Sequence, residues 1–168
     1  MEKSGQRKKR RSATDRQVRH MLDERRKLLA MLMKISRLAH HGPGEPGATV
    51  LEKFCELVVD YTAAGHFGLY QRITQGTERR SRVADLATRV YPPIEKTTQL
   101  ALDFSERYKI DGEHGRPGRL ERDLSRLGEA LTTRMELEDQ LIAAMLEQAP
   151  ARPARSEEHT SELQSHVR

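Results

Sequence analysis

The sequence is poor in the residues that anchor many secreted and enzymatic folds. It contains no tryptophan and one cysteine, and aromatic residues make up 4% of its 168 residues. A single cysteine cannot form an internal disulfide, so a disulfide-stabilised secreted domain is excluded. The core must therefore be aliphatic, which favours packed helices. The length fits one domain, and a cytoplasmic location is expected.

Long apolar runs and alternating patterns are missing as well. No stretch of about 18 apolar residues occurs, so no transmembrane helix or membrane contact is expected. The basic N-terminus is not followed by an apolar segment, and a secretory signal is therefore not expected. No segment alternates apolar and polar residues as a half-buried strand does. The sequence predicts an all-α protein.

The positive charge is concentrated at one end. Residues 1–19 contain eight basic and two acidic residues, a net charge of +6, whereas residues 20–154 contain 20 of each. Residues 1–13 are expected to form a basic disordered tail, because such runs are usually solvated. Direct nucleic-acid binding is not expected of the balanced remainder. Phosphate binding through RKKRR at residues 7–11 stays open as an alternative function.

Apolar residues at helical spacing predict a bundle. The expected helices cover residues 14–39, 51–73, 78–90, 92–108 and 119–148, with glycine- and proline-rich loops at 40–47 and 111–118. We expect residues 14–150 to form an up-down antiparallel helical bundle with short extra helices.

The helix over residues 51–73 carries two unlike faces. Thr49 is expected to cap it, in a T-x-x-E capping box. Gly65 falls on the apolar face, and a glycine within a helix costs about 1 kcal/mol relative to alanine, which indicates close approach by another group. Asp60 and Phe67 share the opposite face. A carboxylate beside an aromatic ring there predicts a partner-binding surface, to which Glu56 also belongs.

The helix over residues 119–148 has a carboxylate on its apolar stripe. Glu138 lies seven residues from both Leu131 and Met145. A buried carboxylate is costly unless it is paired. Candidate partners are Arg25, His66 and Arg134. Two alternatives remain: a buried polar cluster of Arg25, His66 and Glu138, or a Glu138 that reaches water at the bundle rim.

The C-terminal half of the same helix is acidic. Residues 128–148 hold five acidic residues and one arginine, a local charge of −4. Such a face can steer a basic partner. Glu136 and Asp139 are therefore added to the candidate partner-binding residues.

Catalytic and metal-binding patterns are not found. A di-iron bundle needs Glu-x-x-His motifs, and none occurs; nor is there a P-loop, G-x-S-x-G or Cys-x-x-Cys. We expect no enzyme activity, no metal site, no cofactor and no small-molecule ligand. The alternative kept open is a metal- or small-ligand-binding bundle that uses Asp60, His66 and Glu138.

Two ordered blocks carry a resemblance to a known family. The first is FCELVVDYTAAGHFGLY at residues 54–70, and the second is GEALTTRMELEDQLI at 128–142. They resemble the Rsd/AlgQ family of bacterial anti-sigma proteins. The resemblance implies a helical bundle that binds the housekeeping sigma factor through its C-terminal domain, sequesters it and so regulates transcription. Arg19-His20-Met21 replaces a typical Asp-Arg-Trp, which predicts a difference in affinity or partner choice.

The C-terminal end does not fit the fold. Residues 151–168 are expected to be a disordered tail. Residues 155–165, RSEEHTSELQS, resemble the conceptual translation of a sequencing-library adapter. We interpret them as contaminating sequence, with the native C-terminus lost after about Ala154.

Overall fold

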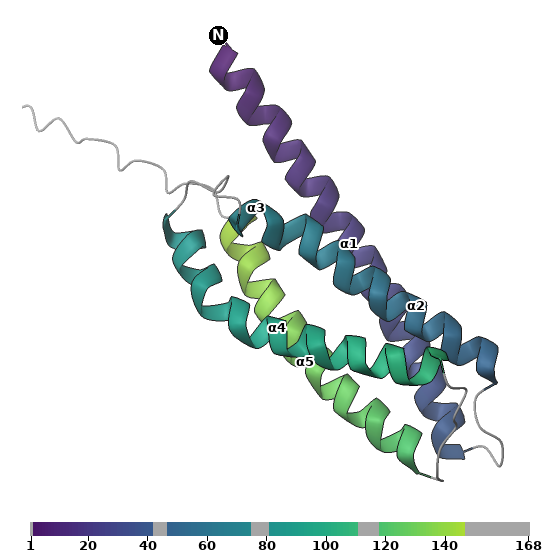
Figure 1. The fold of residues 1–168 in the computed structure, drawn as a ribbon. Coiled ribbons are helices and arrows are strands. Elements are labelled where there is room, and N and C mark those ends of the chain that lie inside the picture. Colours follow the sequence, from purple (N-terminus) through teal and green to yellow (C-terminus); the bar gives the residue numbers. More distant parts are fainter. Residues whose placement is uncertain (1, 42–46, 75–80, 111–117, 147–168) are drawn as a thin grey trace, which may run out of the picture.

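The protein is a bundle of long helices. In the computed structural model, residues 2–41, 47–74, 81–110 and 118–146 are described, and within these ranges there is no strand. The elements in chain order are α1 (Glu2–His41), α2 (Ala48–Gly65), the π-helical turn η1 (His66–Tyr70), α3 (Gln71–Thr74), α4 (Ser81–Ile110) and α5 (Arg119–Leu146). The predicted all-α fold is confirmed (Figure 1).

The four long helices run alternately up and down (Figure 1). Helix α1 packs against α2 and α5, and α4 packs against the same two helices. The helices therefore occupy the corners of a square in which α2 and α5 lie diagonally. Faces of α2 and α5 that point away from the core consequently open on opposite sides of the bundle.

The core is aliphatic with a small aromatic contribution. Phe54 of α2 meets Phe104 of α4 edge to face, with ring centroids 5.7 Å apart, and Phe104 also contacts Tyr108. The remaining interior comes from residues at helical spacing on each helix, including Met21, Leu28, Ile35, Leu69, Leu127, Leu131 and Leu141. Burying one such side chain contributes roughly 1.5–3 kcal/mol.

Helix α1 begins earlier than predicted. It starts at Glu2 rather than near Thr14, so the segment expected to be a disordered tail is helical here. The segment contains no proline, and its arginines and lysines are good helix formers, so the helix continues beyond the bundle. Residues 3–12 are exposed, and Figure 1 shows this purple end projecting away from the other helices.

Helix α2 differs from its prediction at both ends. Gly47 precedes the first helical residue and makes no side-chain capping bond; its carbonyl accepts the N–H groups of Val50 and Leu51. The predicted Thr49 capping box is therefore wrong. At the other end the chain continues through η1 into α3, where a single α-helix was expected.

Helix α4 passes through a double proline. Residues 78–90 and 92–108 were predicted as separate helices, but Ser81–Ile110 is continuous with Pro92 and Pro93 inside it. A proline keeps a helical φ while removing one N–H donor, so the helix bends instead of ending. The bend is visible in Figure 1.

Several sequence predictions fall outside the described residues. These are the loop residues 42–46 and 111–117 and the C-terminal segment that contains residues 155–165. Among the helices that are described, none has an apolar stretch long enough to span a bilayer.

The single thiol provides a test of the core. Cys55 is fully buried. We expect it to react with a thiol reagent only when the bundle opens, at least about a thousandfold slower than in denaturant. The measurement is the labelling rate in buffer and in guanidinium chloride. Equal rates would contradict the described packing of α2.

Candidate functional site

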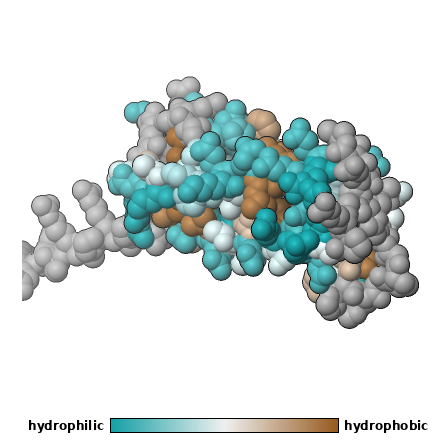
Figure 2. All heavy atoms as spheres, turned by 60° about the horizontal axis from the view of Figure 1, so that its bottom comes forward, coloured by the Kyte–Doolittle hydropathy of each residue, from teal (hydrophilic) through white to brown (hydrophobic). Residues whose placement is uncertain are grey.

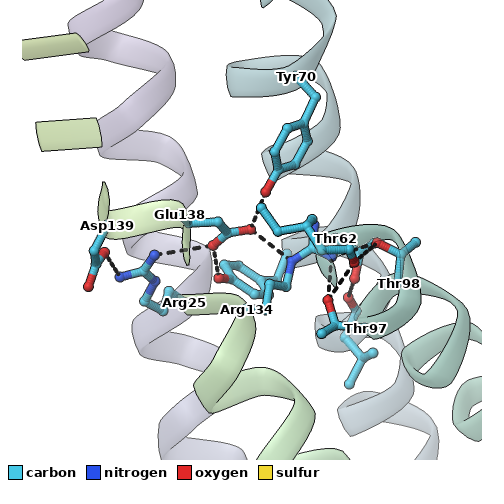
Figure 3. A network of polar contacts seen from close by, with 11 residues as sticks. Arg25, Thr62, Tyr70, Thr97, Thr98, Arg134, Glu138 and Asp139 are labelled. Carbon is cyan, nitrogen blue, oxygen red and sulfur yellow. Dashed lines mark hydrogen bonds and ion pairs between the residues drawn. The ribbon is translucent and has the colours of Figure 1, made fainter. Parts of the chain in front are cut away.

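A buried carboxylate lies at the centre of the bundle. Glu138 of α5 is 0% exposed. Its Oε1 accepts hydrogen bonds from Arg134 Nε at 2.7 Å and Tyr70 Oη at 3.1 Å. Its Oε2 accepts one from Arg25 Nη2 at 3.2 Å and another from Tyr61 Oη. Two donors on each oxygen fill the carboxylate's hydrogen-bonding capacity, which offsets the cost of burial. Figure 3 shows this arrangement.

Arg134 extends the network from α5 to α4. Its side chain is 1% exposed, and Nη1 donates to Thr98 Oγ1 at 2.6 Å and to Thr97 Oγ1 at 3.4 Å. Both threonine hydroxyls donate in turn to the carbonyl of Ile94. The guanidinium carbon also lies 5.7 Å from the ring centre of Tyr61 and 5.9 Å from that of Tyr70. The positive charge of Arg134 is thus surrounded by the Glu138 carboxylate, two threonine hydroxyls and two tyrosine rings.

Arg25 closes the network on the α1 side. Its Nη1 donates to Asp139 Oδ1 at 2.6 Å, while Nη2 bonds Glu138. Burial acts to lower the pKa of Arg25, but the hydrogen bond to Asp139 and the neighbouring Tyr61 raise it above its ordinary value. Arg25 therefore stays charged. We call Arg25, Tyr61, Tyr70, Thr97, Thr98, Arg134 and Glu138 the polar cluster.

The two tyrosines are held in their protonated form. Burial, followed by the adjacent charge of Glu138, raises the pKa of both Tyr61 and Tyr70 above the ordinary range of a phenol. Each hydroxyl consequently remains a donor to the carboxylate. This arrangement suits a structural role, since neither phenol is poised to lose its proton near neutral pH.

Gly65 allows the polar cluster to approach α2. A Cβ at this position would lie 3.1 Å from both Arg134 Nη2 and Glu138 Oε1. The close approach predicted from the sequence is confirmed. Its cause is a pair of charged side chains that pack directly on the α2 backbone.

The structure corrects one member of the predicted buried cluster. Arg25 and Glu138 are in contact as predicted, and Glu138 does not reach water at the rim. His66, however, is exposed, and its ring meets Phe67 edge to face with centroids 5.1 Å apart. The residue that follows Gly65 is turned away from the core, so His66 cannot pair with Glu138.

Sequence reasoning missed four members of the polar cluster: Tyr61, Tyr70, Thr97 and Thr98. Tyr61 follows Phe54 and Val58 on the buried stripe of α2, which was a usable signal. Tyr70 was not predictable this way. It follows Tyr61 by nine positions, which in a regular α-helix would turn it to roughly the opposite face. The wider π-helical turn η1 brings it back to the interior.

Phe67 forms a ridge on the outer face of α2 and η1. It is 58% exposed, on the face where the sequence predicted it with the exposed Asp60. Phe67 and Ala63 both line two depressions, one toward α1 and one toward α4, of about 490 and 340 Å³. We call these the α1 groove and the α4 groove. On the side of the molecule seen in Figure 2, apolar surface occurs in separate patches among hydrophilic side chains.

The two grooves differ in chemistry. The α1 groove contains Glu24 and Asp60. The α4 groove is largely apolar, with Val59 and Leu102 partly exposed at its sides and Arg134 of the polar cluster among its lining residues. The polar cluster therefore supports the outer face as well as the core.

The five predicted partner-binding residues do not form one surface. Glu56, Asp60 and Phe67 are exposed on α2 and η1, whereas Glu136 and Asp139 are exposed on α5. These helices are diagonal in the bundle, so the two sets open on opposite sides. Glu56 is paired with Lys53 at 3.2 Å, and the charge of Asp139 is partly neutralised by Arg25.

The alternative metal-ligand set is not assembled. Asp60 and His66 are exposed on α2 and η1, while Glu138 is buried with all its acceptor positions engaged. Within the four described ranges, no group of three or more histidine, cysteine, aspartate or glutamate residues could hold a metal ion.

The fold and site define an all-α bundle with an internally satisfied polar core and an exposed aromatic ridge between two grooves. Comparison with known protein families assigns this bundle to a family. The sequence model described as "Regulator of RNA polymerase sigma(70) subunit, Rsd/AlgQ" matches residues 1–146. The chain belongs to the Rsd/AlgQ family, as its two sequence blocks indicated.

Several relatives are named regulators of sigma D. The chain is 42% identical over 95 residues to that of Yersinia enterocolitica, covering 55% of this chain and 56% of the relative. It is 36% identical over 100 residues to those of Shigella boydii and Escherichia coli O1:K1, covering 59% of this chain and 63% of each relative. Each alignment thus spans less than two thirds of the relative. No solved structure matches the chain significantly.

The polar cluster predicts unequal effects at two neighbouring carboxylates. Glu138→Gln leaves Arg134 and Arg25 without their buried anion and should lower the free energy of unfolding by about 3–5 kcal/mol. Asp139→Asn removes a more exposed pairing and should cost less than about 1 kcal/mol. Denaturant unfolding followed by circular dichroism measures both. Equal losses would contradict the central role of Glu138.

A second pair of variants tests the close approach at Gly65. Gly65→Ala gains about 1 kcal/mol of helix propensity, but the new methyl group crowds the hydrogen-bonded Arg134 and Glu138. We expect a net loss of about 1–3 kcal/mol. Gly128→Ala is the matched control, since its nearest neighbour is Leu32 Cδ2 at 4.0 Å, and it should be neutral or stabilising. A stabilised Gly65→Ala variant would refute the packing constraint.

Proposed function

We propose that this protein is an anti-sigma factor that binds the C-terminal domain of the housekeeping sigma factor, sequesters it and so regulates transcription. Membership of the Rsd/AlgQ family supports sigma factor regulation as the general role. The observation that carries the proposal at the level of residues is Phe67, exposed between two grooves beside Asp60.

An exposed phenylalanine is well suited to anchor a protein partner. Aromatic side chains bury a large area with little loss of side-chain freedom, and they dominate many interfaces. Phe67 contributes little to the core of this bundle, because 58% of its surface is exposed. Its grooves could accept side chains from the partner on either side of the ring. The remainder of the contact would exclude water from this anchor.

The charge near Phe67 fits the proposed partner. Asp60 and Glu56 are exposed on this face, one helical turn apart, whereas Glu24 lines the same groove but is buried and paired with Lys27 at 2.8 Å. The C-terminal domain of a sigma factor contacts the promoter −35 element and is expected to be basic. Acidic side chains at the rim would steer it and fix its orientation, and the anti-sigma factor would then compete with DNA.

The proposal uses the α2 face rather than the α5 face for direct contact. Glu136 and Asp139 lie on the diagonal helix, and a single small domain that covers Phe67 does not reach them. Asp139 is also engaged by Arg25 at 2.6 Å. In this proposal Glu136 and Asp139 contribute to binding only through long-range electrostatic attraction. Mutations on the α2 face and on the α5 face should therefore have different effects on binding.

Phe67→Ala should weaken binding to the sigma factor by about 2 kcal/mol or more, a roughly 30-fold rise in Kd. Its melting temperature should stay near that of the parent, because the ring is mostly exposed. Isothermal titration with the isolated C-terminal domain of the sigma factor measures the Kd, and thermal unfolding measures the melting temperature. The matched control is Met33→Ala, which truncates a 60% exposed side chain on α1.

The control should bind as the parent does. If Met33→Ala and Phe67→Ala weakened binding equally, general surface hydrophobicity would replace the ridge as the explanation. If the parent bound no sigma factor at all at moderate salt, the anti-sigma proposal would fail.

A further inference from the structure

The N-terminal end of α1 is a helix without a bundle around it. Residues 3–12 are all exposed. The first partly buried residues of α1 are Ala13 to Asp15, and the first fully buried one is Val18. Figure 1 shows the segment continuing the axis of α1 past the end of the bundle. We call residues 3–12 the basic arm. A helix held at one end by a folded bundle is a directed projection, unlike the solvated tail expected from composition.

The basic arm carries uncompensated charge. It contains six basic residues and no acidic one. The salt bridges among the described residues involve none of these six side chains. Helical spacing groups four of them on one face: Lys3, Arg7, Arg10 and Arg11. This face presents a row of positive charges that matches a polyanionic partner.

The composition of the arm narrows the class of polyanion. The sequence KSGQRKKRRS has no aromatic and no large apolar side chain. It therefore cannot insert an apolar face into a membrane surface or an apolar groove. It also lacks the aromatic rings on which single-stranded bases stack. The arm is therefore suited to contacts made through charge alone, and the phosphate backbone of a duplex offers such contacts at regular spacing.

The dimensions favour duplex DNA. A helix is about 10–12 Å across with its side chains, which matches the width of about 12 Å of the major groove of B-form DNA. The major groove of duplex RNA is too narrow for it. A basic helix that runs continuously out of a helical bundle is also how several dimeric DNA-binding proteins reach the groove.

We propose that the basic arm binds the phosphate backbone of duplex DNA without sequence preference. Lysine and arginine neutralise phosphates and release counterions, and the arm has only three other polar side chains, Ser4, Gln6 and Ser12. This activity is separate from the proposed sigma factor binding, because it uses residues 3–12 and not Asp60 or Phe67.

The test measures binding of the full chain to a fluorescent duplex of about 20 base pairs by anisotropy, at several salt concentrations. With four phosphate contacts, affinity should fall by roughly 100-fold between about 50 and 200 mM salt. The arm variant combines Lys3→Gln, Arg7→Gln, Arg10→Gln and Arg11→Gln, since glutamine keeps similar helix propensity. It should lose most of the binding and of the salt dependence.

The control variant removes equal charge from exposed sites on the bundle: Lys34→Gln, Arg37→Gln, Arg89→Gln and Arg126→Gln. It should bind the duplex nearly as the parent does. Equal loss in both variants, or no salt-dependent binding by the parent, would overturn the proposal. Competition by polyglutamate as effective as that by DNA would overturn it in favour of an acidic protein partner. Unchanged sigma factor binding by the arm variant would separate the two activities.

Discussion

The carboxylate of Glu138 is the group on which the arrangement of the bundle depends. It lies where the long helices converge, and the groups that satisfy it come from α1, α2, η1 and α5, with α4 joined through Arg134 and the two threonines. Apolar contacts tolerate small sliding of one helix on another, but a fully hydrogen-bonded ion does not, because any displacement leaves a charge unpaired. The polar cluster thus fixes helix register in a core made mostly of interchangeable aliphatic side chains.

The same cluster links the interior to the face proposed for sigma factor binding. Arg134 contacts Glu138 with one edge of its guanidinium and lines the α4 groove beside Phe67. Tyr70 and Thr98 belong to both sets. The proposed binding face is therefore built on the most constrained part of the core, which suits recognition by a preorganised surface. The basic arm is much less constrained, because it contacts the bundle only at its C-terminal end.

The bundle and the crowding at Gly65 were predictable, because each completes or breaks a 3.6-residue pattern that is visible in the sequence; the same pattern placed Glu138 on the apolar stripe but left open whether it is buried or reaches water at the rim. The errors have physical causes. Pro92 and Pro93 read as a helix end although their φ angles suit a helix. His66 was assigned to the interior from its neighbours, and Tyr70 could not be assigned, because a π-helical turn leaves no periodic signal in one sequence. The opposite orientation of the α2 and α5 acidic faces depends on packing, which spacing alone does not encode.

The π-helical turn η1 takes up one residue of the chain without changing the direction of the side chains that follow. A π turn contains one residue more than the α-helical turn it replaces. In a regular α-helix, Tyr70 would lie nine steps from Tyr61 and face about 180° away from it, and the wider turn of His66–Tyr70 offsets about one step of this rotation. Deleting one of residues 66–69 would restore a regular helix and leave Tyr70 eight steps, or about 80°, from Tyr61. This segment should therefore accept the loss of one residue, whereas one further inserted residue would turn Tyr70 away from Glu138.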